Sequence, residues 1–130
     1  MASQFAKFKK KAMKKAIFVA KATGVEMGNQ ITQSTPVDSG LARASWQGAI
    51  GSPKGDLTPD TGRNPSVEFE VTLRDLGVGD VAYFTNPQPY IIPLEYGWSA
   101  KSPSGMIRKT VALFPQIVRH KIKDAERVKL

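Results

Sequence analysis

The first quarter of the chain has the pattern of one long amphipathic helix, and this feature most limits the possible folds. Small or apolar residues recur every three or four positions in residues 2–33, the spacing of one helical face. They are Phe5, Phe8, Ala12, Ala16, Val19, Thr23 and Met27. Pro36 disfavours helical geometry at the residue before it, so we expect a basic N-terminal helix within residues 1–34 that ends by about Ser34. Gly24 and Gly28 weaken its second half and predict a break or bend there.

The composition excludes several classes of function. A length of 130 residues suits a single domain, residues 1–130. The chain has no cysteine, which rules out disulfides, thiol catalysis and thiolate metal sites. His120 is its single histidine, so multi-histidine metal sites are excluded and a Ser-His-Asp site is disfavoured. No apolar run approaches the length of about 18 residues that a transmembrane helix needs. We therefore expect no thiolate or multi-histidine metal site and no transmembrane helix.

Charge is unevenly distributed along the chain. The net charge is +8, with seven lysines and no acid in residues 1–25 and an excess of bases after residue 100. The stretch 26–100 carries nine acids against four bases. This pattern allows a basic end of one copy to contact the acidic middle of another. It also allows a basic surface to face a polyanion.

The middle of the chain predicts turns and three strands. Pro36 and Gly40 indicate a turn, and Asp38 is placed to cap a short helical turn over residues 41–44. We expect a strand over 45–50, a long flexible loop over 51–66 and a second strand over 67–73. Apolar and polar residues alternate strictly along this second strand, which predicts one apolar and one acidic face and pairing with 45–50 in a hairpin. The residues are Val67, Glu68, Phe69, Glu70, Val71, Thr72 and Leu73. A turn over 75–80 then leads to a short strand over 81–85.

The last third predicts a short helical segment and a final long helix. Residues 90–96 form an apolar helix or turn, residues 98–105 a loop, and residues 106–128 a helix. Its apolar stripe is Ile107, Val111, Phe114, Val118, Ile122 and Ala125. Pro115 should kink it. The expected fold class is α+β, with the N-terminal and C-terminal helices packed on a small antiparallel sheet.

Three short stretches carry a family resemblance. They are residues 35–46, with the sequence TPVDSGLARASW, residues 86–97, which end in LEYG, and the Met-Ile-Arg start of the final helix at Met106. Their order resembles the neck, or tail-completion, proteins of long-tailed bacteriophages, the group of the lambda minor tail protein Z type. Ser39 stands where that family more often has threonine. The resemblance covers nearly the whole chain in order.

The resemblance implies a structural role without catalysis, so we expect no enzyme, no metal, no cofactor and no membrane partner. Proteins of this group form a ring between the head-closing connector and the tail tube. The implied partners are copies of the chain itself in a hexamer or dodecamer, the head-closure and tail-terminator or tail-tube proteins, and DNA in the channel. The implied location is the neck of the virion, and the host cytoplasm during assembly. The alternatives are a tail terminator, a basic nucleic-acid-binding protein, a small enzyme, for which the sequence shows no catalytic constellation, and a membrane-active helix over residues 2–22.

The candidate contact residues fall into two groups. The candidate subunit interface comprises Arg43, Trp46, Glu68, Glu70, Tyr90, Glu95, Tyr96 and Trp98, because aromatic residues and arginine are enriched at interfaces. The candidate DNA or neighbouring-ring contacts are Lys7, Lys10, Lys11, Lys14 and Lys21. Each has a plainer explanation. Capping and turn chemistry accounts for residues 36–46, Arg43 is a surface charge or pairs with Glu95 or a neighbouring subunit, and the lysines form a solvated helix face.

Overall fold

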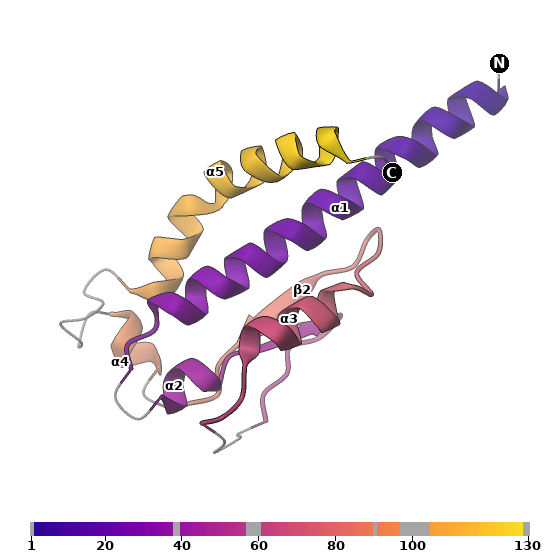
Figure 1. The fold of residues 1–130 in the computed structure, drawn as a ribbon. Coiled ribbons are helices and arrows are strands. Elements are labelled where there is room, and N and C mark those ends of the chain that lie inside the picture. The colour runs from indigo at the N-terminus through magenta and orange to yellow at the C-terminus, as the bar shows by residue number, and fades with distance from the viewer. Residues whose placement is uncertain (1, 38–39, 57–60, 90, 97–104, 129–130) are drawn as a thin grey trace.

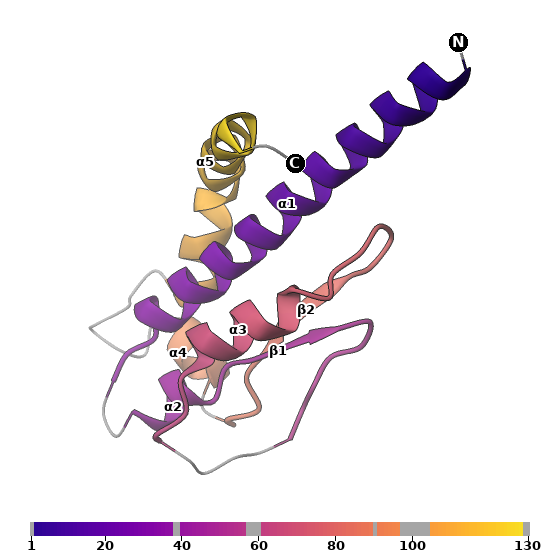
Figure 2. The same cartoon turned by 45° about the vertical axis from the view of Figure 1, so that its right-hand side comes forward.

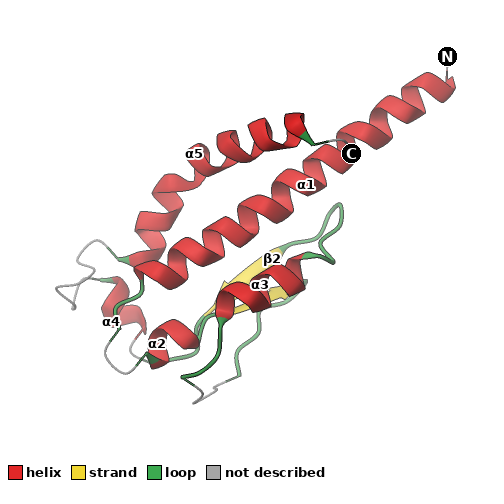
Figure 3. Cartoon of the chain, viewed as in Figure 1, coloured by secondary structure: helices red, strands yellow, loops and turns green. Residues whose placement is uncertain are grey.

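The fold is α+β, with one long helix between a second long helix and a small helix–sheet unit (Figures 1 and 2). The computed structural model describes residues 2–37, 40–56, 61–89, 91–96 and 105–128. Helix α1 (Ala2–Ser34) runs between α5 (Met106–Arg127) and α3 (Pro65–Leu73), and α3 lies against strands β1 (Gln47–Ile50) and β2 (Ala82–Thr85). The short helices α2 (Leu41–Ala44) and α4 (Ile91–Glu95) lie at one end of this assembly (Figure 3).

Helix α1 ends where Pro36 predicts, but it has no break at its glycines. It runs unbroken for 33 residues, about 50 Å at the usual rise. Gly24 and Gly28 instead let α3 approach closely. A Cβ at Gly28 would stand 2.5 Å from Cδ2 of Phe69, and one at Gly24 would stand 2.9 Å from Cδ1 of Leu73. The expected bend is therefore wrong, because these glycines serve helix packing.

The predicted strand over 67–73 is wrong, because this segment is helix α3. Its buried residues are Pro65, Phe69 and Leu73, which follow a period of four, whereas Val67 and Val71 are 55% and 53% exposed. Pro65 occupies the first turn, where proline suits a helix, and Glu68 lies near the positive end of the helix dipole. The alternation of valine and glutamate predicted a strand, but packing against α1 decides the conformation and favours a helix.

The sheet consequently has two strands. β1 pairs antiparallel with β2, with Gln47 opposite Thr85 and Ile50 opposite Ala82. The predicted turn over 75–80 and the short strand after it are confirmed. The Asp80 carboxylate accepts a hydrogen bond from the Gly77 backbone N–H at 2.7 Å within the turn, and β2 follows. The loop between β1 and α3 is shorter than 51–66, since α3 begins at Pro65. Its first part runs along the sheet, where Gln47 Nε2 donates to the Asp56 carbonyl oxygen at 2.5 Å.

The core joins all layers at the end near α2 and α4. Ile31, Trp46, Phe69 and Met106 form one buried cluster, and Phe84 packs against it. The Phe69 and Phe84 rings meet edge to face, with their centroids 4.9 Å apart. Met106 brings the start of α5 into contact with the sheet region.

Most of helix α5 packs along α1 rather than on the sheet. It contains Pro115 and bends along its course (Figure 1), as the sequence predicts. It buries Met106, Thr110, Ile117 and Ala125. Of the predicted apolar stripe, Val111 is 57% and Phe114 47% exposed. The stripe exists but is only partly covered by the described chain.

Candidate interface surfaces

The first motif stretch closes the C-terminal end of α1. Thr35 Oγ1 donates to the Ile31 carbonyl at 2.7 Å and accepts from Trp46 Nε1 at 2.8 Å. Arg43 donates to the carbonyl oxygens of Gln33 and Thr35 at 3.0 and 3.1 Å, groups that a helix end leaves unpaired. The Arg43 side chain therefore caps α1, whereas Glu95 forms its ion pair with Arg108. Trp46 is 2% exposed, so it serves the core in this structure.

The second motif stretch is hydrogen-bonded to the first. Asn86 Nδ2 donates to the Ala42 carbonyl at 2.7 Å, and Gln88 Nε2 donates to Ser45 Oγ at 2.9 Å. Gln88 and Ser45 are both buried. The residues after β2 are thus fixed against α2.

Glu95 joins the second stretch to the third, at the start of α5. Its carboxylate accepts from the backbone N–H of Ile107 at 2.6 Å, from the N–H of Arg108 at 3.2 Å and from Arg108 Nε at 2.9 Å. The Arg108 guanidinium also bonds the Glu95 carbonyl. Gly105 has a φ of +77°, and a Cβ there would collide with the carboxylate. Glu95 is therefore the anion that satisfies the N-terminus of α5.

Electrostatics keep Glu95 ionised. Burial raises the pKa of this carboxyl, but hydrogen bonds from the Arg108 side chain and from the Ile107 and Arg108 amides, together with the Arg108 charge, hold it below its ordinary value of 4.5. A carboxylate in this state only accepts hydrogen bonds. Its geometry is that of a structural cap.

Tyr96 is the exposed aromatic residue beside this corner. It is 68% exposed, and the Arg108 guanidinium carbon lies 5.2 Å from its ring centroid. An exposed tyrosine stacked with arginine has the residue types that interfaces favour. Tyr90 and Trp98, the other aromatic candidates, lie outside the described residues.

Glu68 and Glu70 do not form a common acidic face. They stand two positions apart on α3, so their side chains leave the helix in nearly opposite directions. Glu68 forms an ion pair with Arg63. Glu70 lines a separate hollow together with Lys21 and Arg74. Both remain exposed and available to a partner, each on its own side.

Four of the five candidate lysines lie on a projecting part of α1. Residues 3–14, called the arm below, are exposed throughout. The N-terminal end of the arm projects beyond the other elements (Figure 2), and its following turns lie beside Val78, in the turn before β2. The arm carries Lys7, Lys10, Lys11 and Lys14, whereas Lys21 is half-buried farther along the helix. Phe5 and Phe8 on the same arm are 70% and 71% exposed.

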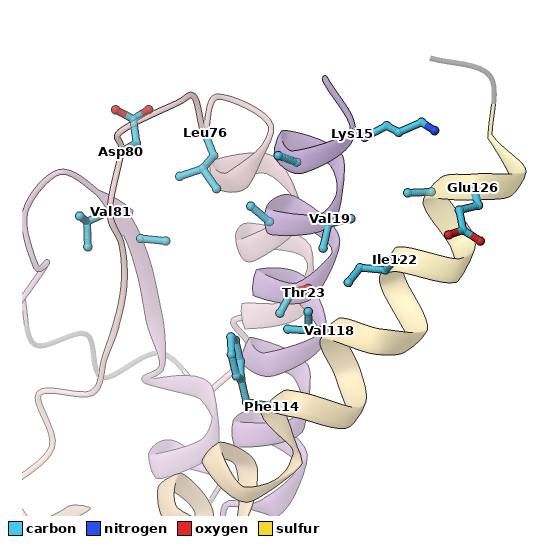
Figure 4. A pocket seen from close by; sticks show the side chains of 14 residues that line it. Lys15, Val19, Thr23, Leu76, Asp80, Val81, Phe114, Val118, Ile122 and Glu126 are labelled. Carbon is cyan, nitrogen blue, oxygen red and sulfur yellow. The ribbon is translucent and has the colours of Figure 1, made fainter. Parts of the chain in front are cut away.

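A large apolar groove lies next to the arm, and sequence reasoning missed it. It has a volume of about 900 Å³ and is bounded by the middle of α1, by α5 and by the segment that leads into β2 (Figure 4). Val19, Leu76, Val81, Phe114, Val118 and Ile122 are among its lining residues. The signal was present in the sequence, because the groove is where the apolar stripes of the two long helices face each other.

Other kinds of site find no support in the described part of the chain. No group of three or more His, Cys, Asp or Glu residues there could hold a metal ion. No helix in the described ranges is long and apolar enough to cross a membrane. This chain matches no family of known proteins, no curated protein and no solved structure.

Proposed function

We propose that this chain is a structural subunit of a bacteriophage neck, which assembles into a ring at the head–tail junction and completes the tail. The observation that carries the proposal is the convergence of the three motif stretches. Residues 35–46, residues 86–96 and the start of α5 meet in one hydrogen-bonded corner around Trp46 and Glu95. Stretches that belong to one family pattern are expected to cooperate in this way.

The surfaces support an assembly role over chemistry. The pKa of Glu95 is lowered by its hydrogen bonds and by the Arg108 charge, and this carboxylate serves as a helix cap. The exposed features are an amphipathic arm, an apolar groove and the Tyr96–Arg108 pair. Surfaces of this kind are used for contacts between subunits.

The arm also favours a second function, contact with DNA. Lys7, Lys10, Lys11 and Lys14 are exposed on one projecting helix, without an acid among residues 3–14. Lysines presented in this way bind phosphates with a steep salt dependence and without base recognition. In a neck ring such contacts would face the channel. In a free nucleic-acid-binding protein they would be the whole function.

The decisive experiment is electron microscopy of lysates from a phage that lacks this gene, with and without the gene supplied in trans. We expect full heads and separate tails, or tails with malformed upper ends, and rescue by the supplied gene. Separate normal tails would indicate a joining role, whereas malformed tail ends would indicate a terminator. Intact, joined and infectious particles without the gene would refute the proposal and leave DNA binding as the leading function.

A further inference from the structure

The arm and the groove have matching surfaces that their own chain leaves uncovered. Successive residues turn by about 100° around a helix, which places Phe5, Phe8 and Ala12 within about 80° of the direction of Ala16 and Val19. Ala16 and Val19 line the groove. The apolar face of the arm is therefore the continuation of one groove wall, and both lack a cover among the described residues.

An arm cannot reach the groove of its own chain. The arm and the groove wall are parts of one continuous helix, Ala2–Ser34, and a helix cannot fold back on itself without a break. Figures 1 and 2 show the arm pointing away from the rest of the molecule. An arm that fills a groove must come from another copy.

We propose that the arm of one copy docks, apolar face inward, in the apolar groove of a second copy. An amphipathic helix in an apolar groove is a common mode of recognition, with anchors spaced three or four residues apart. Phe5 and Phe8 are the anchors on the arm. In the groove the exposed partners are Val81, Phe114 and Ile122, which are 54%, 47% and 44% exposed.

Charge at the groove rim suits a lysine-rich guest. Asp80 and Glu126 line the groove from opposite sides, against the single lysine Lys15 (Figure 4). The arm carries five lysines and no acid. Lys9 is the one arm lysine on the apolar side, so in a docked arm it would lie beside the groove and its rim carboxylates.

The area involved predicts association that depends on concentration. Two phenylalanine rings bring about 300–500 Å² to the contact, and the groove contributes a similar area. Together with lysine stems this approaches the lower limit of about 1,200 Å² for specific interfaces. Association should therefore become visible at micromolar protein and should weaken in high salt.

The first test measures the mass of the purified protein by analytical ultracentrifugation over a wide concentration range. The wild-type mass should rise above the 14.2 kDa of one chain. The Phe5→Glu/Phe8→Glu variant should remain a monomer, and Val81→Glu in the groove should do the same. Ser3→Glu/Lys7→Gln is the matched control, because it changes net charge by the same two units on the opposite face of the arm. It should associate like wild type, and circular dichroism should show the same helix content in all four proteins.

The second test introduces single cysteines for cross-linking, because the sequence contains none of its own. Copies with Ala12→Cys are mixed with differently tagged copies that carry Val81→Cys, and a short thiol–thiol cross-linker is added. The mixed dimer should form far faster than it does when Lys14→Cys, two residues along but on the opposite face, replaces Ala12→Cys. A monomeric wild type at all concentrations, association that survives Phe5→Glu/Phe8→Glu or Val81→Glu, or equal cross-linking by both pairs would each overturn the proposal. Binding of monomers to anionic vesicles would then assign the arm to a membrane surface.

This inference deepens the proposed function. Its statement that the contact joins neighbouring subunits of a ring rests on that proposed function. The two fail separately. Self-association through arm and groove, with no neck defect in the phage, would keep the contact and refute the neck role. A neck defect with a protein that never self-associates would keep the neck role and refute the contact.

Discussion

Gly28→Ala should destabilise the protein, although alanine is the better helix former. Propensity alone would raise the free energy of unfolding by about 1 kcal/mol. The new Cβ, however, would stand 2.5 Å from Cδ2 and 2.8 Å from Cε2 of Phe69. Carbon atoms in contact prefer about 3.5–4.0 Å, so the ring or the helix must move by about 1 Å.

The Phe69 ring has no free space into which it can retreat. It is 1% exposed, and its other side faces Gly48, where a Cβ would stand 2.9 Å from Cδ1. Its edge meets Phe84 with the ring centroids 4.9 Å apart. Overpacking of this kind costs about 1–3 kcal/mol. After the propensity gain of about 1 kcal/mol, we expect a net loss of about 0–2 kcal/mol and a fall in Tm of up to about 7 °C.

The assay is thermal and urea unfolding followed by circular dichroism, with Gly55→Ala as the control. Gly55 is exposed and has nothing within 4 Å of its Cβ position, so its replacement should leave Tm nearly unchanged. Combining Gly28→Ala with Phe69→Leu should cost less than the sum of the single changes, because the smaller side chain relieves the contact. A rise in Tm for Gly28→Ala would refute the close approach of α1 and α3.

Two further perturbations test the corner around Glu95 and Trp46. Glu95→Gln should lower the free energy of unfolding by about 1–3 kcal/mol at neutral pH. Because the pKa of folded Glu95 lies below 4.5, this contribution is complete above the unfolded pKa and is lost as pH falls through the folded pKa. Denaturant titrations from about pH 5 to pH 3 should therefore show the difference from wild type shrinking, and a constant difference would contradict the capping role. Trp46→Phe removes the 2.8 Å bond to Thr35 Oγ1 and should cost about 1–2 kcal/mol in the same assay, whereas Tyr96→Phe, which keeps the exposed ring, should cost almost nothing.

The sequence predicted the elements whose signals are local. Pro36 marked the end of α1, and Gly40 has the positive φ, +87°, expected at its turn. Pro115 marked the bend of α5. The position of Leu41–Ala44 also agreed with the predicted helical turn, although Asp38, its expected cap, lies outside the described residues.

The errors arose where contacts between residues far apart in the sequence decide the local structure. The segment around Phe69 alternates like a strand, but the glycines of α1 and β1 create a space that fits its ring on a helix. The partners of Glu95 could not be predicted from its sequence neighbours, because they are backbone amides and an arginine side chain twelve and thirteen residues away. The apolar stripes on α1 and α5 were predicted correctly. A stripe in the sequence does not, however, indicate whether other parts of the same chain will cover it.

The continuity of α1 has a consequence for the geometry of any assembly. The helix that forms the arm is the same helix that α3 and α5 hold in the core, and its 33 residues contain no proline and no interruption. A copy held by its arm is therefore held at one fixed angle, with no hinge to absorb misalignment. One-way docking repeated at a fixed rotation gives either a closed circle of defined size or an endless spiral. In this chain the copy number would be set by the direction of a single helix axis.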